Sequence, residues 1–218
     1  MHSSKAKGVS NGLVHIDGCL TIRCSGRRAL LFLVVVWLNA CSTLSPIGQP
    51  GTTAGQRVDQ PGVSFTPPDG KAWSVLMRST YQVVLGAQGS GNETYVTSVN
   101  VYQLPGGLSP EQFLAHVKTG RAAEPQTGRF ELISNNEQPY TDRPEVCVKH
   151  RSTSKDHGAR RGGDFTLVDY LGMNCIHPSS PQVGVFVELS RKAATPADAS
   201  FDADGIRLLR SVAFAQFK

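Results

Sequence analysis

Two cysteine–histidine pairs are the part of this chain whose residue types and spacing could do chemistry. Cys147 precedes His150 by three positions, and Cys175 precedes His177 by two. Two thiolates and two imidazoles could hold a zinc ion in tetrahedral geometry. On a β-strand, however, side chains three positions apart point to opposite faces, so Cys147 and His150 would not meet at one metal ion. Zinc is therefore an alternative rather than the main prediction.

The same two cysteines could instead bond to each other. They form an even pair in a domain that follows the export signal described below, and disulfides persist in exported proteins. A Cys147–Cys175 bridge would close a loop of about 28 residues and add about 3.6 kcal/mol of stability in the chain-entropy model. Strict alternation would place Cys175 on the face of Met173 and Cys147 on that of Lys149. We therefore predict a bulge at Gly172 that breaks the alternation before Cys175.

Two short motifs could indicate a serine nucleophile. Residues Ser152–Lys155 (STSK) match S-x-x-K, and Lys118–Gly120 match K-T-G, both of which occur in penicillin-recognising enzymes. Here their order is reversed and no S-D-N segment lies between them. Because motifs this short recur by chance, no catalytic residue is assigned and no cofactor is expected.

Three carboxylates lie near the start of the last predicted helix: Asp198, Asp202 and Asp204. Their simplest explanation is favourable negative charge at a helix N-terminus rather than acid–base catalysis or calcium binding.

An enzyme remains an alternative if its residues converge only in three dimensions. A small envelope hydrolase would need a pocket in which His116, His150 or His177 meets a serine or a carboxylate at hydrogen-bonding distance. Without such a cluster, a non-enzymatic binding or scaffolding domain is favoured.

A basic segment lies between two predicted strands. Residues 151–163 (RSTSKDHGARRGG) include Arg151, Lys155, Arg160 and Arg161. One interpretation is a basic loop that contacts an anionic partner such as lipid headgroups, glycan phosphate or an acidic protein. The other is an ordinary solvated hairpin loop.

The N-terminal region carries a short apolar run. Residues 29–38 read ALLFLVVVWL and follow Arg27 and Arg28. A membrane-spanning helix takes roughly 20 apolar residues, so this run is too short to span a bilayer. It fits the hydrophobic region of a signal peptide, which runs about 7–15 residues after a basic flank.

The end of this run resembles the lipobox of bacterial lipoproteins. Residues Leu38–Cys41 read LNAC, in which Leu38, Ala40 and Cys41 match the pattern and Asn39 departs from the usual small residue. The resemblance implies cleavage before Cys41 and lipid on its sulfur, with several acyl chains giving stable anchoring. Residues 1–40 are then the signal peptide, although Met1–Gly26 is long for its basic region and leaves open a start nearer Arg27.

The segment after the cleavage site reads as a tether. Residues 41–62 are rich in proline, glycine and small polar residues and have no apolar periodicity, so they are expected to be a flexible coil. Ser42, rather than aspartate, follows the lipidated cysteine. By the sorting pattern of enteric lipoproteins this favours the outer membrane, with the domain facing the periplasm.

The charge of the chain belongs mainly to the leader. The net charge is +5, with 22 basic and 17 acidic residues. The leader holds five of the basic residues and one of the acidic residues, so the remainder is close to neutral. A nucleic-acid partner is not expected, because such domains carry a clustered basic surface. The predicted partners are the membrane, through Cys41, and another envelope protein or a glycan.

Residues 63–218 are predicted to form a single α+β domain, an antiparallel sheet covered by two helices. A capping box at Ser109–Gln112 starts one helix, which Gly120 should end. The second runs over about 200–213. Apolar alternation predicts strands over residues 72–78, 81–85, 94–104, 130–134, 145–150, 164–173 and 182–189. This order distantly resembles the Mog1/PsbP-like sandwich.

Overall fold

The computed structural model describes residues 55–122, 128–158 and 164–217. The chain divides into two units, Met1–Leu44 and Ser45–Lys218, and every described residue belongs to the second. The predicted signal peptide and Cys41 lie outside the described residues. None of the helices in the described ranges is long and apolar enough to cross a membrane.

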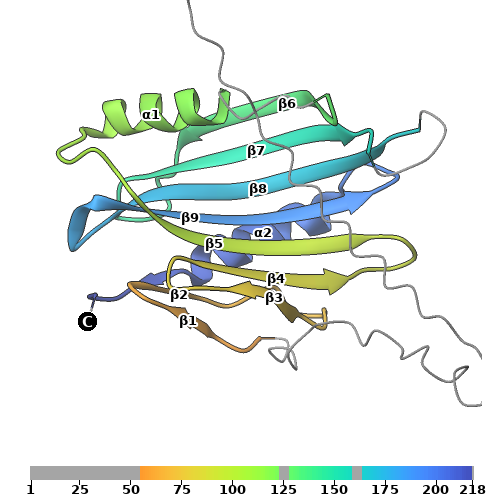
Figure 1. Cartoon of the computed structure of the whole chain (residues 1–218), viewed down its shortest axis with the longest axis horizontal. Coiled ribbons are helices and arrows are strands. Elements are labelled where there is room, and N and C mark those ends of the chain that lie inside the picture. The colour runs from red at the N-terminus through yellow and green to blue at the C-terminus, as the bar shows by residue number, and fades with distance from the viewer. Residues whose placement is uncertain (1–54, 123–127, 159–163, 218) are drawn as a thin grey trace, which may run out of the picture. The chain divides into compact units, whose positions relative to one another are not determined.

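The described residues form an α+β domain with two antiparallel sheets and two helices (Figure 1). The helices are α1 (Pro110–Ala122) and α2 (Ala199–Ser211). The strands are β1 (Val58–Gln60), β2 (Val63–Phe65), β3 (Ser74–Arg78), β4 (Gln82–Gln88), β5 (Thr94–Gln103), β6 (Phe130–Pro139), β7 (Cys147–Asp156), β8 (Thr166–His177), β9 (Ser180–Ala193) and β10 (Ala213–Phe214).

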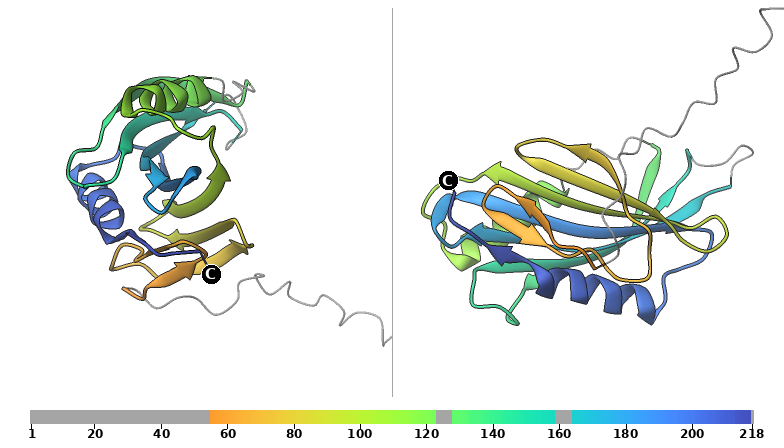
Figure 2. Two further views of the ribbon diagram at one scale, coloured as in Figure 1. Left: turned by 90° about the vertical axis from the view of Figure 1, so that its left-hand side faces the viewer. Right: turned by 90° about the horizontal axis from the view of Figure 1, so that it is seen from below.

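The larger sheet has seven strands in the order β3-β4-β5-β9-β8-β7-β6, and the smaller has the order β1-β2-β10. The end-on view in Figure 2 shows the larger sheet curling strongly, with α2 on one flank and α1 above the β6 end. The predicted fold class, an antiparallel sheet covered by two helices, is confirmed.

One face of the larger sheet holds the main hydrophobic core. Helix α2 packs Phe201, Leu208 and Leu209 against strand residues that include Met173 and Val187, and all five are almost completely buried. The small sheet covers the rest of this face with Val58, Val63 and Phe65. Burial of this apolar surface is the main stabilising term of the fold.

Helix α1 covers part of the opposite face. Its Phe113 and Val117 pack with Leu104 and Val148 in a second, smaller cluster. The predicted capping box is confirmed, because Gln112 accepts a hydrogen bond from the Ser109 backbone amide and donates its own backbone amide to Ser109 Oγ. The prediction that Gly120 ends the helix is wrong, since α1 continues to Ala122 and places Arg121 over the sheet.

Several strands differ from their predicted bounds. Residues Val58–Gln60, which were assigned to the tether, form β1 and pair with β2. Strand β7 extends to Asp156 and β6 to Pro139, beyond the apolar positions used to predict them. Both extensions are polar, and hydrophobic periodicity gives no signal for a polar strand segment.

The predicted disulfide joins Cys147 and Cys175, with the sulfur atoms 2.03 Å apart. The two residues are directly opposite each other on β7 and β8. The predicted bulge at Gly172 is wrong, because β7 and β8 pair without interruption from His150↔Gly172 to Cys147↔Cys175. No bulge is needed, because Cys147 and Cys175 already lie on the same face of the sheet. Helix α2 covers this face, which Cys147 shares with Lys149, and Cys147 is buried there.

Candidate functional site

A buried polar row distinguishes the α1 face of the sheet. Along β7, every second side chain points to this face, and after Val148 these are His150, Ser152, Ser154 and Asp156. All four are at most 8% exposed. Buried polar groups need partners, so this row is expected to form hydrogen-bonded networks with α1 and the neighbouring strands.

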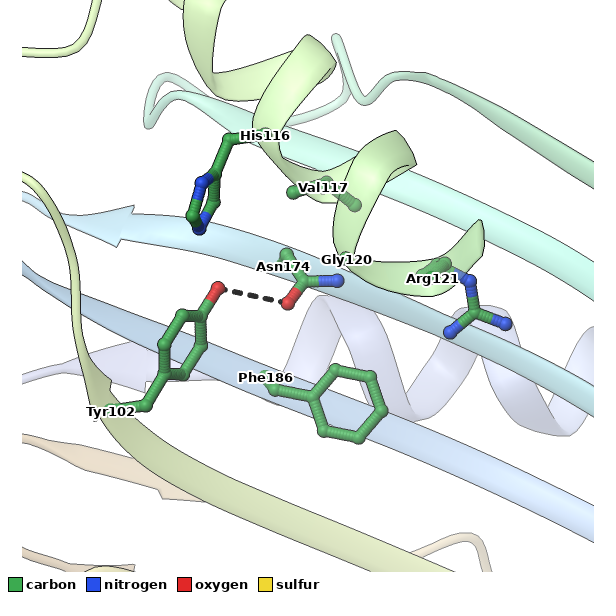
Figure 3. Close-up of a pocket in the computed structure, with 7 residues that line it drawn as sticks. All are labelled: Tyr102, His116, Val117, Gly120, Arg121, Asn174 and Phe186. Carbon is green, nitrogen blue, oxygen red and sulfur yellow. Dashed lines mark hydrogen bonds between the residues drawn. The ribbon is translucent and has the colours of Figure 1, made fainter. Parts of the chain in front are cut away.

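A pocket of about 180 Å³ opens beside this row, between α1 and the middle of the sheet (Figure 3). Helix α1 contributes His116, Val117, Gly120 and Arg121. The sheet contributes Tyr102 from β5, Asn174 from β8 and Phe186 from β9. We refer to these seven residues as the α1 cleft. Its lining combines two aromatic rings with an amide, an imidazole and a guanidinium.

Tyr102 and Asn174 form the floor of the α1 cleft. The hydroxyl of Tyr102 donates a hydrogen bond to Oδ1 of Asn174 at 3.0 Å (Figure 3). Burial raises the pKa of Tyr102 to about 12, so this phenol keeps its proton at neutral pH. The ring lies against Gly184 on β9, where any added side chain would collide with it. The contact with β9 at Gly184 therefore fixes the orientation of the Tyr102 ring.

Arg121 is held by three side chains of the sheet. It donates a hydrogen bond from Nη2 to Ser152 Oγ at 3.0 Å. Its Nε and Nη1 lie 3.4 Å and 3.7 Å from carboxylate oxygens of Glu137 and Glu188. Its side chain is 12% exposed. The last turn of α1 is thus tied to β6, β7 and β9, and the local positive charge of Arg121 is balanced by carboxylates.

His150 lies behind the cleft and is completely buried. Its Nε2 is 2.8 Å from Oε2 of Glu188, and because the carboxylate accepts, this nitrogen carries the proton. The imidazole stacks parallel to the ring of Phe186, with centroids 5.7 Å apart. Within the described residues, Nδ1 of His150 has no hydrogen-bond partner. His150 therefore positions Phe186, which lines the cleft, and Glu188, which pairs with the cleft residue Arg121.

Gly172 is required by this histidine rather than by a bulge. A Cβ at position 172 would lie 2.5 Å from Cε1 of His150 and 2.6 Å from the carbonyl oxygen of Val187. We expect Gly172→Ala to lower the free energy of unfolding by about 1–3 kcal/mol, because overpacking displaces the ring or the strand. Urea unfolding measures this loss. Gly106→Ala is a suitable control, because a Cβ there meets no atom within 4 Å; equal stability of the two variants would contradict this account.

The four residues of the alternative zinc site are not brought together. The two thiols are bonded to each other, and His150 points to the face opposite Cys147. His177 is 1% exposed, with Nε2 at 2.9 Å from the carbonyl oxygen of Gly62. Among the described residues there is no group of three or more histidine, cysteine, aspartate or glutamate side chains that could hold a metal ion.

The predicted basic loop is in part a strand. Arg151 and Lys155 lie on β7. Arg151 forms ion pairs with Asp169 at 3.1 Å and Asp202 at 2.9 Å, which join β7 to β8 and α2. Lys155 pairs with Glu131 at 2.8 Å. These two cations thus support the fold, while Arg160 and Arg161 lie outside the described residues.

The contacts that a hydrolase would need are met only away from the cleft. His150 meets Glu188, but neither residue lines the α1 cleft. His177 Nδ1 is 3.2 Å from Ser179 Oγ within the β8–β9 turn, again outside it. His116 lines the cleft, and the described residues offer it neither a serine nor a carboxylate at hydrogen-bonding distance.

A second pocket of about 330 Å³, between the start of α1 and the β6–β7 connection, is mainly apolar.

Sequence reasoning missed most of the cleft. Tyr102 and Phe186 were predicted only as parts of strands, Asn174 lay one position beyond the predicted strand 164–173, and Arg121 was placed beyond the end of the helix. One signal was available, since Glu188 is an acidic residue inside the most apolar predicted strand. A buried or half-buried carboxylate in such a strand indicates a cationic or hydrogen-bonding partner.

No family model and no curated protein matches this chain. The chain is distantly similar to the crystal structure of a protein from Bacteroides thetaiotaomicron VPI-5482, with a TM-score of 0.41 and 9% sequence identity over 75% of this chain and 50% of that one. The chain thus spans about half the length of that protein. The resemblance to the Mog1/PsbP-like sandwich stays a prediction.

Proposed function

We propose that this chain is a lipid-anchored protein of the bacterial envelope whose domain binds another envelope component without catalysing a reaction. The resemblance of Leu38–Cys41 to a lipobox supports the anchor, with lipid on Cys41 and the domain facing the periplasm from the outer membrane. The disulfide between Cys147 and Cys175 supports an oxidising compartment, because such bonds persist outside the cytosol.

The α1 cleft is the proposed binding site, and a sugar ring of an envelope glycan is its proposed ligand. Binding sites typically combine apolar walls with a few convergent polar groups that orient the ligand. Here the walls are the rings of Phe186 and Tyr102, and the polar groups are Asn174, Arg121 and His116. The volume of about 180 Å³ suits one ring rather than an extended molecule.

The chemistry of the lining supports binding rather than catalysis. None of the described residues that line the cleft is a serine, threonine or cysteine. The one hydroxyl there, on Tyr102, already donates to Asn174 and has a pKa raised to about 12. It is therefore a weak nucleophile and a stable hydrogen-bond donor at neutral pH.

Titration calorimetry with the N-acetylglucosaminyl-N-acetylmuramic acid disaccharide tests this assignment. We expect Phe186→Ala to weaken binding at least tenfold, equivalent to about 1.4 kcal/mol, because the apolar wall of the cleft is lost. His116→Ala should also weaken binding of the disaccharide, because it removes one of the polar groups that line the cleft. His116 is exposed, so this replacement does not disturb the core.

Lys118→Ala is the matched control, because Lys118 is exposed on the same helix and does not line the cleft. It should bind like the unmodified protein. Failure of the unmodified protein to bind the disaccharide, or equal binding by all three variants, would rule out this ligand at this site.

A further inference from the structure

Exposed apolar side chains gather on the β3–β4 hairpin. Leu76 is 57% exposed, Met77 is 52% exposed and Tyr81 is 69% exposed. Leu76 and Met77 lie on β3, at the outer edge of the seven-stranded sheet, and Tyr81 lies in the connection to β4. Leu76 lies over Gly86, which leaves no side chain to cover it on β4. We call Leu76, Met77 and Tyr81 the apolar hairpin.

The apolar hairpin lies beside the strand that leads back to the predicted anchor. Arg78 donates a hydrogen bond to the carbonyl oxygen of Asp59 at 2.6 Å, and Gln60 donates one to the carbonyl oxygen of Ser79 at 2.7 Å. These bonds attach β3 and its turn to β1, the first strand of the domain. The hairpin and β1 lie next to each other at one edge of the fold in Figure 1.

The distance from the anchor to this edge is bounded by the chain. Thirteen residues, 42–54, lie between Cys41 and the first described residue, Gly55. Fully extended, they reach at most about 50 Å. A lipid on Cys41 therefore keeps the β1–β3 edge within about 50 Å of the bilayer surface. Strand β6 is at the opposite end of the seven-stranded sheet.

We propose that the apolar hairpin docks on the surface of the bilayer that holds the lipid of Cys41. This inference rests on the proposed lipid anchor. Tyrosine is enriched at membrane interfaces, where its ring is apolar and its hydroxyl reaches water. Arg78 is exposed next to this surface and, within the described ranges, forms no ion pair, so the guanidinium N–H groups other than the one bonded to Asp59 can donate to a lipid phosphate.

The geometry of β3 favours lipid over a second protein strand as the occupant. An open sheet edge can pair with a strand of another chain when it is long and regular. Here β3 has five residues and a register shift between Val75 and Met77. Such a bulge interrupts the row of hydrogen-bonding groups that an added strand would need. What this edge offers to a partner is therefore its exposed side chains rather than a regular row of backbone hydrogen-bonding groups.

The test uses a single thiol at the hairpin of the processed, lipid-anchored protein. In the mature chain, Cys41 carries lipid and Cys147 is bonded to Cys175, so Tyr81→Cys adds one free thiol for an environment-sensitive fluorophore. Leu132→Cys is the matched control, because Leu132 is 47% exposed on β6 at the opposite edge of the sheet. Each labelled protein is purified from membranes and reconstituted in vesicles of phosphatidylethanolamine and phosphatidylglycerol.

We expect quenching at position 81 by lipids that carry a nitroxide on the acyl chain, protection there from aqueous iodide, and the opposite result at position 132. Protection from iodide without quenching by the lipids would mean that protein covers the hairpin, and full access to iodide would mean that nothing does. Either result overturns the inference while leaving the anchor intact. Intact mass of the same sample reports separately on the anchor, and a chain without acyl mass would overturn both.

Discussion

Replacing Cys147 with serine is expected to lower the midpoint of thermal unfolding by roughly 10 °C. The bridge to Cys175 closes a loop with a sequence separation of 28. Cross-linking at that separation reduces the entropy of the unfolded chain by an amount worth about 3.6 kcal/mol at 25 °C. For a domain of this size, each kcal/mol shifts the midpoint by about 2–4 °C.

The location of the bridge adds to this effect. Cys147 is 5% exposed and Cys175 is fully buried, and both belong to the main core that α2 covers. A serine hydroxyl at position 147 would be buried among apolar side chains, and such a group costs free energy unless it is hydrogen-bonded.

Differential scanning calorimetry without reductant measures the shift. Cys147→Ala/Cys175→Ala is the control, since it removes the bridge without introducing a hydroxyl, and it should show most of the same loss. The unmodified protein in reductant should approach the double variant. A midpoint unchanged in the double variant would show that the bridge does not stabilise the fold.

Replacing Asp156 with alanine is expected to lower the free energy of unfolding by about 2–3 kcal/mol, the scale of losing hydrogen bonds to charged groups. Asp156 is 1% exposed and accepts two hydrogen bonds from Arg129, at 2.8 Å and 3.0 Å, and one from Lys192 at 2.6 Å. The Gly158 amide donates a fourth at 3.0 Å. This carboxylate thus fastens the end of β7 to β9 and to the start of β6.

The same contacts make the stability depend on pH. Hydrogen bonds from Arg129, followed by those from Lys192 and Gly158, hold the pKa of Asp156 well below its usual range. A depressed pKa in the folded state gives stability that is present above the unfolded value of about 3.9 and is lost as the pH falls through the folded value. The difference in free energy of unfolding between the native protein and Asp156→Asn should therefore become smaller as the pH falls below about 4.

Urea unfolding at neutral pH and near pH 3 checks both statements. Asp142→Asn is the matched control, because Asp142 pairs only at the surface, with Arg210 at 3.3 Å, and surface pairs contribute little. A constant difference between the native protein and Asp156→Asn across this range would contradict the assigned charge of Asp156.

The pattern of apolar and polar residues in the sequence predicted those elements in which the apolar residues are buried and the polar residues are more exposed. Strands β5 and β9 alternate buried and half-buried residues, and the capping box of α1 lies within four residues. The extension of β7 could not be predicted in this way, because Ser152, Ser154 and Asp156 are polar and buried. The small sheet also escaped detection, because it pairs strands of two or three residues from the two ends of the domain, as in Ala213↔Ser64.

The candidate site was not predictable for a related reason. The Tyr102–Asn174 hydrogen bond joins residues 72 positions apart, and the His150–Glu188 contact joins residues 38 apart. Neither spacing is a motif, since it is set by the order of strands in the sheet. The disulfide was predictable because only two cysteines remain after the leader and Cys41 are set aside.

The intact mass of the protein extracted from membranes tests the central claim most directly. We predict a chain that begins at Cys41, carries added acyl mass, and gains two protons on reduction of the Cys147–Cys175 bridge. An unprocessed chain without acyl mass would contradict the lipid anchor, and with it the proposed envelope location and the membrane-docking role of the apolar hairpin.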